Sequence, residues 1–241
     1  MDWTNVIWNK YWSKLKEEKT LIEVKNLVKK YGDHVAVDNL SFTVEKGQIL
    51  GFLGPNGAGK STTMNMITGY ISATEGSVSI NGYDIYEEPE EAKKCIGYLP
   101  ELPPVYPDMT VREYLNFVAE IKKVEKSRKK QMLQEIMERI QIVDVADRLI
   151  KHLSKGYKQR VGLAQALVGY PEVIILDEPT TGLDPQTRQH VWATIRNIQK
   201  KTNMTIFLTT HYMEEAADSD YVIVLDNGEI AAKGTPSELR S

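Results

Sequence analysis

The sequence predicts an α/β domain in which helices enclose a largely parallel β-sheet. Two apolar runs support this prediction: VIILD at residues 173–177 and TIFLTT at residues 205–210. Both are continuous rather than alternating, as strands buried on both faces of a parallel sheet are. A glycine-rich segment at residues 54–61 lies between a predicted strand and a predicted helix. This strand, loop and helix order is typical of α/β folds.

The composition fits a globular protein and limits its partners. The 241 residues suffice for one large α/β domain or two small ones. The net charge of −3 gives no general attraction to nucleic acid, and none is expected as a partner. The single cysteine, Cys95, excludes an intrachain disulfide and suits a reducing compartment. No apolar run reaches the roughly 18 residues needed to span a bilayer, and no signal-peptide pattern is seen, so we expect any membrane-crossing part to belong to another chain.

Residues 1–20 precede the first predicted strand and are interpreted as a separate amphipathic extension. On a helix, their apolar side chains would cover about half of the circumference, interrupted by Lys14. Tryptophans beside lysines suit a helix at a membrane interface or in the groove of a partner. The alternative is a tail that packs on its own domain. The apolar residues concerned are Trp3, Ile7, Trp8, Tyr11, Trp12 and Leu15.

The main domain is predicted over residues 21–241. Short β-rich runs (LIEV, LSFTV and QILGFLG) come first, and a mostly helical stretch follows at about residues 88–168. Thr110 and Glu113 form a capping-box pattern in that stretch, which we interpret as a helical subdomain inserted between strands of the sheet. Near the end, Asn227 and Gly228 between two β-rich runs predict a hairpin, because Asn-Gly readily adopts positive φ angles.

The glycine-rich segment GPNGAGKS matches the pattern G-x-x-x-x-G-K-[ST] between the strand and the helix that the pattern requires. Its glycines allow backbone N–H groups to converge on phosphate oxygens, and the helix N-terminus adds a partial positive charge. Lys60 would reach the outer phosphates of a nucleotide, and Ser61 would bind Mg²⁺. Such a string arises by chance in roughly one chain in a hundred of this size, given average glycine usage of about 7%. The predicted phosphate-binding residues are Gly54, Pro55, Asn56, Gly57, Ala58, Gly59, Lys60, Ser61 and Thr62.

Two carboxylates end the predicted strand VIILD, at the sheet edge where open α/β folds bind ligands. We interpret Asp177 as the residue that holds Mg²⁺ through water, and Glu178 as the base that polarises the water attacking the γ-phosphate. The alternative is a solvated strand end. A phosphate-binding loop, a metal-binding carboxylate and a base appear together in this chain, which favours the catalytic interpretation.

At residues 153–167, LSKGYKQRVGLAQAL, the chain resembles the ATP-binding cassette (ABC) family. The resemblance covers nearly all of residues 21–239. It implies a P-loop NTPase fold with an N-terminal antiparallel β-subdomain, a mixed sheet core and an inserted helical subdomain. It also implies that Ser154 and Gly156 contact the γ-phosphate bound to the opposite subunit. Ser154 is a good N-cap as well, so an ordinary capped helix is the alternative.

The same resemblance assigns roles to three further residues. Tyr31 would stack on adenine, Asp184 in TTGLDP would couple the two sites, and His211 would contact the γ-phosphate and help to place the water. Taken singly, Tyr31 fits strand packing and His211 fits an ordinary loop residue.

The chain departs from the family pattern at two places. Lys155 and Tyr157 replace the usual Gly and Gln of the signature, while the Ser and Gly that contact phosphate remain. Glu101, in GYLPE, stands where many members have Gln, which places an extra carboxylate near the metal and near the transmembrane partner. The first part of the chain looks like cassettes of gliding-motility and copper-associated exporters. The part after Pro185 looks more like drug-exporter cassettes of the daunorubicin-resistance type.

The resemblance implies an ATP-hydrolysing subunit of an exporter that uses ATP and Mg²⁺. Its expected partners are a separate transmembrane permease and a second nucleotide-binding subunit, and its expected location is peripheral, on the cytoplasmic face of the cell membrane. One alternative is a soluble cassette protein acting on ribosomes or DNA, although such proteins usually carry two cassettes or a long coiled-coil insertion. The other is a regulatory module with negligible turnover, against which Glu178 and His211 argue.

Overall fold

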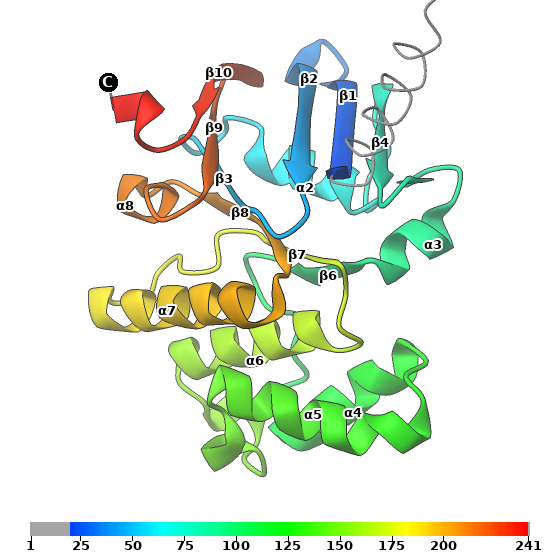
Figure 1. Cartoon of the computed structure of the whole chain (residues 1–241), viewed down its shortest axis with the longest axis vertical. Helices are drawn as coiled ribbons and strands as arrows, with labels where there is room; N and C mark the ends of the chain where they lie inside the picture. Colours follow the sequence, from blue (N-terminus) through cyan, green and yellow to red (C-terminus); the bar gives the residue numbers. More distant parts are fainter. Residues whose placement is uncertain (1–19, 241) are drawn as a thin grey trace, which may run out of the picture.

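Two β-sheets and a layer of helices form the described part of the chain, residues 20–240, in a computed structural model (Figure 1). The strands are β1 (Thr20–Tyr31), β2 (His34–Glu45), β3 (Ile49–Leu53), β4 (Glu75–Ile80), β5 (Tyr83–Asp84), β6 (Ile96–Leu99), β7 (Val173–Leu176), β8 (Thr205–Thr210), β9 (Tyr221–Asp226) and β10 (Glu229–Gly234). The helices are α2 (Lys60–Ile67), α3 (Pro89–Lys94), α4 (Val111–Ile121), α5 (Lys126–Ile140), α6 (Lys155–Leu167), α7 (Pro185–Thr202) and α8 (Met213–Ala216). This mixed α/β architecture confirms the predicted fold class.

The larger sheet has six strands in the order β10-β9-β3-β8-β7-β6. All its neighbouring strands are parallel except β9 and β10, which form the hairpin predicted at Asn227 and Gly228. The smaller sheet is antiparallel, with the order β2-β1-β4-β5. Parallel neighbours β3, β8 and β7 all end on one side, so the loops that follow them meet at one edge.

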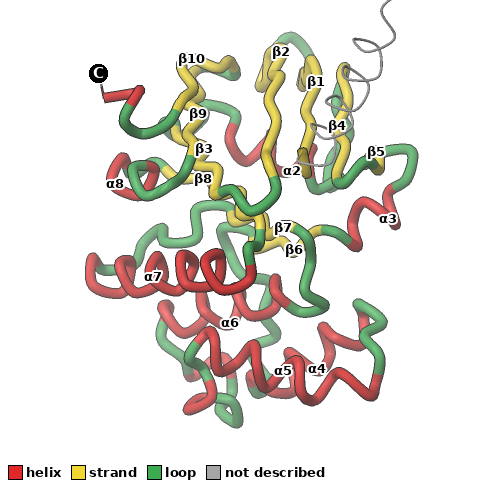
Figure 2. Tube along the Cα trace, viewed as in Figure 1, coloured by secondary structure: helices red, strands yellow, loops and turns green. Residues whose placement is uncertain are grey.

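Two hydrophobic clusters lie on opposite faces of the six-stranded sheet. Within β7, Ile174 and Leu176 pack with α4, α5, α6 and α7, whereas Val173 and Ile175 pack with α2 and the smaller sheet. This alternation follows from the period of two along a strand, and it explains why VIILD is apolar throughout. Figure 2 shows the resulting arrangement, with helices α4–α7 below the strands of the large sheet and strands β1, β2 and β4 of the smaller sheet above β6 and β7.

Local sequence signals account for several helix boundaries. Thr110 caps α4 and accepts a hydrogen bond from the backbone of Glu113, whose side chain accepts from the backbone of Thr110, so the predicted capping box is confirmed. Asn203, with a φ of 53°, follows α7 in the left-handed conformation that ends many helices.

None of the helices among residues 20–240 has both the length and the apolar character that a bilayer-spanning helix needs.

The middle of the chain contains more than helices. Residues 96–99 form β6, the edge strand that pairs with β7, inside the stretch predicted to be mostly helical. The run IGYL is only four residues long, and so short an apolar run does not distinguish a strand from a buried helix segment. The division into a main domain and a helical subdomain at about residues 88–168 stays a prediction. The predicted amphipathic extension lies outside the described residues, apart from Thr20, which begins β1.

Candidate functional site

An open cleft of about 390 Å³ lies at the carboxyl ends of β3, β7 and β8, beside the end of β1. Segments that are distant in the sequence meet there, as expected for an α/β fold. The cleft contains many of the predicted site residues. Its lining consists of Tyr31, His34, Ala36, Asn56, Gly57, Gly59, Lys60, Ser61, Thr62, Glu101, Glu178, Thr181 and His211.

The glycine-rich loop curls around the end of the Lys60 side chain. Lys60 Nζ donates to the carbonyl oxygens of Gly54, at 2.7 Å, and Pro55, at 3.1 Å. Gly59 precedes α2 with a φ of 99°, and a Cβ there would lie 2.7 Å from the carbonyl oxygen of Ala36. Both the conformation and the space therefore require glycine at this position.

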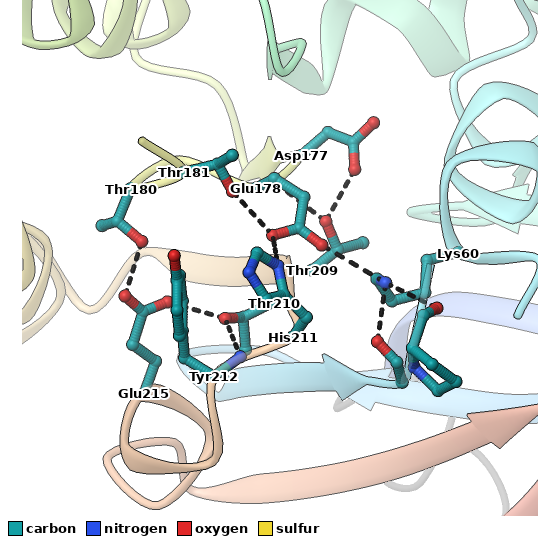
Figure 3. A network of polar contacts seen from close by, with 12 residues as sticks. Lys60, Asp177, Glu178, Thr180, Thr181, Thr209, Thr210, His211, Tyr212 and Glu215 are labelled. Atoms are coloured by element: carbon teal, nitrogen blue, oxygen red, sulfur yellow. Dashed lines mark hydrogen bonds and ion pairs between the residues drawn. The ribbon is translucent and has the colours of Figure 1, made fainter. Parts of the chain in front are cut away.

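The Glu178 carboxylate lies between a lysine and a histidine (Figure 3). Its Oε1 is 3.3 Å from Lys60 Nζ, and its Oε2 is 2.8 Å from His211 Nδ1. Thr181 Oγ1 also donates to Oε2, at 2.9 Å. The side chains of Lys60 and Glu178 are 5% and 8% exposed. Burial strengthens the attraction between their charges, because less water screens them.

The backbone of Glu178 is in an unusual conformation. Its φ is 48°, in the left-handed region that residues other than glycine rarely adopt. A backbone conformation of this kind costs roughly 1–3 kcal/mol of folding free energy, so the surrounding contacts must hold it in place. Thr209 supplies one of these contacts, since its Oγ1 accepts a hydrogen bond from the backbone N–H of Glu178, at 2.8 Å. The strained turn directs the carboxylate toward Lys60 and His211.

Asp177, which directly follows β7, faces the first turn of α2. Its Oδ1 accepts hydrogen bonds from Thr209 Oγ1, at 2.6 Å, and from Ser61 Oγ, at 3.4 Å. Burial raises the pKa of Asp177, and the hydrogen bonds from Thr209 and Ser61 oppose this rise. A cation bound beside this carboxylate would stabilise its charged form.

The oxygen atoms of Ser61 and Asp177 suit a magnesium ion that is shared with a ligand. Residues 20–240 contain no cluster of three or more His, Cys, Asp or Glu side chains able to hold a metal alone. Mg²⁺ is usually bound through one or two carboxylates together with substrate phosphates. Glu101 lines the same cleft but is not part of such a cluster. The donors present therefore fit a metal that arrives with phosphate.

Ser154, Gly156 and Asp184 lie away from this cleft, at the starts of α6 and α7. Ser154 caps α6, where its Oγ accepts from the backbone N–H of Tyr157, at 3.3 Å. Asp184 caps α7 and accepts from the backbone N–H of Thr187, at 3.0 Å. A Cβ on Gly156 would lie 2.7 Å from Thr187 Cγ2, so the two helix starts are close neighbours. The structure thus brings Ser154, Gly156 and Asp184 together, but not into the cleft that holds Lys60.

Tyr31 ends β1 at the rim of the cleft. Its side chain is 52% exposed, and Lys29 Nζ lies 5.1 Å from the centre of its ring. The nearby cation is attracted to the ring by a cation–π interaction. A half-exposed ring at the rim is accessible to a flat ligand.

The sequence analysis missed four threonines and a glutamate around the cleft. The threonines follow or end strands β7 and β8, and the glutamate belongs to α8 (Figure 3). One signal was available, because TIFLTT ends an apolar strand with two hydroxyl side chains that are fully buried. Buried hydroxyl groups need hydrogen-bond partners. The missed residues are Thr180, Thr181, Thr209, Thr210 and Glu215.

Known proteins resemble this chain over most of its length. A model of the ABC transporter family matches residues 37–181. The linearmycin resistance ATP-binding protein LnrL of Bacillus subtilis is 37% identical over 222 residues, covering 92% of this chain and 71% of LnrL. The Nod factor export ATP-binding protein I of Burkholderia orbicola is 38% identical over 219 residues, covering 90% of this chain and 72% of that protein. The cholesterol transporter ABCA5 of Homo sapiens is 38% identical over 238 residues, but this chain spans only 14% of its length.

Solved structures of ATP-binding cassettes have a fold similar to that of this chain. The structure of an ATP-binding subunit of an ABC transporter has a TM-score of 0.82 at 33% identity and covers 92% of each chain. A dimeric post-hydrolysis state of the ATP-binding cassette MJ0796, bound to ADP and Pi, has a TM-score of 0.80 at 25% identity, covering 90% of this chain and 99% of that one. With the family match and the shared fold, these similarities confirm the resemblance noted in the sequence: this chain belongs to the ABC transporter family, in which it corresponds to the ATP-binding cassette.

Proposed function

We propose that this chain binds and hydrolyses ATP to drive an exporter, and that it works as a dimer with a second cassette. The observation that supports the proposal most directly is the position of the Glu178 carboxylate, 3.3 Å from the Lys60 ammonium and 2.8 Å from the His211 ring. A base, a phosphate-binding cation and a histidine thus share one cleft with Ser61, whose Oγ is hydrogen-bonded to Asp177. A phosphate-binding lysine, metal-binding oxygens and a residue that activates or places water are recurring parts of sites that hydrolyse nucleoside triphosphates.

In the proposed reaction the chain positions ATP and accepts a proton. Backbone N–H groups of residues 54–62 hold the phosphates, Lys60 offsets their negative charge, and Tyr31 stacks on the adenine. Ser61 and Asp177 would hold Mg²⁺, which would supply positive charge to offset that of the phosphates. Glu178 accepts a proton from water as the water oxygen bonds to the γ-phosphorus, and the bridging P–O bond breaks to release ADP.

His211 has two tasks in this proposal. Its Nδ1–H, 2.8 Å from Glu178 Oε2, donates a hydrogen bond to the carboxylate and orients it. When the ring is protonated on both nitrogens, Nε2 donates to a γ-phosphate oxygen as well. Glu101, at the Gln position of the family pattern, would lie near the metal and would face the transmembrane partner.

The second cassette completes the site. Ser154, Gly156 and Asp184 form a group of their own at the starts of α6 and α7, apart from the cleft with Lys60. Two copies related by a two-fold axis would each offer these residues to the other's nucleotide. ATP would then stabilise the closed dimer, because its γ-phosphate contacts both halves, and hydrolysis would permit opening.

Mixing two inactive variants tests this arrangement. We expect Lys60→Ala protein and Ser154→Arg protein each to lose ATPase activity, the first through its phosphate loop and the second by blocking the start of α6. A mixed dimer keeps one complete site, formed by Lys60 of one copy and Ser154 of the other, so mixing should restore activity. At equal amounts, about half of the dimers are mixed if pairing is random, and each has one of two sites, so about a quarter of wild-type activity is expected. Mixtures that stay inactive, although cross-linking shows that mixed dimers form, would contradict the shared site.

Export is supported by what the relatives' names say of them: linearmycin resistance in one and Nod factor export in another. We propose that the partner is a membrane-spanning permease and that the cassette lies on the cytoplasmic face of the membrane. Affinity purification of the tagged Glu178→Gln protein from gently solubilised native cells, followed by mass spectrometry, should recover a multi-span membrane protein in stoichiometric amount. Recovery of ribosomal or DNA-repair proteins without any membrane protein would favour the soluble alternative.

A further inference from the structure

Glu215 is a buried carboxylate that has no part in the reaction as described. It lies in α8, which begins two residues after His211, and it is 4% exposed. Its Oε1 accepts a hydrogen bond from Thr180 Oγ1, at 2.5 Å, and its Oε2 accepts one from Thr210 Oγ1, at 2.7 Å. One side chain therefore connects the loop after β7 with the end of β8 (Figure 3).

The direction of these hydrogen bonds is fixed. The hydroxyl of Thr210 also accepts a hydrogen bond from the backbone N–H of Tyr212, at 3.0 Å. A threonine hydroxyl has only one proton to donate, and here that proton points to the Glu215 carboxylate. The residues on both sides of His211 are thus held in one chain of hydrogen bonds that ends at Glu215.

The two consecutive threonines of β8 connect to different groups. Neighbouring side chains on a strand point to opposite faces. Thr209 Oγ1 donates to Asp177, at 2.6 Å, whereas Thr210 Oγ1 donates to Glu215. Thr180 is the other donor to Glu215. The end of β8 is therefore connected to the segment around Glu178 on both faces of the strand, through Asp177 on one face and through Glu215 and Thr180 on the other.

The contact between Glu178 and His211 joins the same two loops that Glu215 joins. The two residues follow different strands, β7 and β8, so their separation of 2.8 Å is set by how the two loops are held together. No basic side chain among residues 20–240 forms an ion pair with Glu215, so hydrogen bonds from threonine hydroxyls compensate the burial of its charge. If one of these bonds is lost, the carboxylate no longer holds both loops.

We propose that Glu215 is a positioning residue for hydrolysis, which holds Thr180 and Thr210 so that His211 stays in contact with Glu178. This inference rests on the proposed function, since it assigns to Glu215 a task that acts through His211. It predicts that changes at Glu215 slow turnover without weakening ATP binding, because Glu215 does not line the cleft.

Steady-state kinetics of Glu215→Gln in the full-length protein test the proposal. An amide has one acceptor oxygen in place of two, so one of the two threonine hydroxyls loses its acceptor. We expect kcat to fall about 10- to 100-fold, because misplacing a catalytic group by about 1 Å can cost about 10²-fold. The Kd for ATP should change by less than about two-fold. Glu214→Gln is the matched control, since this neighbouring glutamate is exposed, and its kinetics should equal those of the wild type.

A second variant separates positioning from a general loss of structure. Combining Glu215→Gln with His211→Ala should lower the single-turnover rate little beyond His211→Ala alone, because effects that act through the same residue are not additive. A structural role would instead give additive losses, together with a lower Tm and weaker ATP binding for Glu215→Gln. That pattern, or an unchanged kcat for Glu215→Gln beside an active wild type, would overturn the proposal. A wild type without ATPase activity would instead contradict the proposed function itself.

Discussion

The Glu178→Gln protein should bind ATP normally and hydrolyse it about 10² to 10⁴ times more slowly than the wild type, the usual loss when a general base is removed. Glutamine fills the same space and can still accept a hydrogen bond from Thr181, but it cannot take up the proton of the attacking water. Binding should survive, because the backbone N–H groups of residues 54–62 and Lys60 are unchanged. Single-turnover hydrolysis and titration with a fluorescent ATP analogue measure the two effects separately.

The same variant should accumulate as an ATP-bound dimer, detectable by size-exclusion chromatography, since hydrolysis is the step expected to allow opening. Glu172→Gln is a suitable control, because this exposed carboxylate lies just before β7, six residues from Glu178. Near-normal turnover in Glu178→Gln would mean that Glu178 is not the base. Loss of ATP binding would mean that its charge supports the position of Lys60.

Gly97→Ala should cause the largest loss of stability among single methyl additions to the sheet. Gly97 lies in β6 against α6, and an added Cβ would overlap the backbone carbonyl of Ala166. A backbone atom cannot move aside as a flexible side chain can, so the strand and the helix would have to separate. Overpacking costs about 1–3 kcal/mol, sometimes more, and we expect the upper part of that range in the free energy of unfolding, measured by denaturant titration.

Gly234→Ala provides the control for this effect. An added Cβ there would lie 3.0 Å from Glu238 Oε2, at the end of an exposed side chain, and a small shift of that end costs less than moving backbone atoms. We expect its unfolding midpoint to stay close to that of the wild type. Equal midpoints for Gly97→Ala and Gly234→Ala would show that β6 and α6 are not as closely packed as described.

Structural features that depend on residues adjacent in the sequence were predicted correctly. The buried strands, the hairpin at Asn227 and the capping box at Thr110 each depend on a few adjacent residues. The connection from Thr180 through Glu215 to Thr210 depends instead on contacts between loops that only the folded sheet brings together. Periodicity and motif spacing carry no information about such contacts. For the same reason, the positive φ of Glu178 could not be read from the sequence.

Helices α4 and α5 lie apart from the cleft, so their sequences can vary independently of it. Of the described residues that line the cleft, none belongs to α4 or α5. Substitutions on the exposed faces of these two helices can therefore accumulate without altering the groups proposed to hold and hydrolyse ATP. Relatives of 37–38% identity differ from this chain at most positions, and the outer faces of α4 and α5 are places where such differences leave the cleft intact.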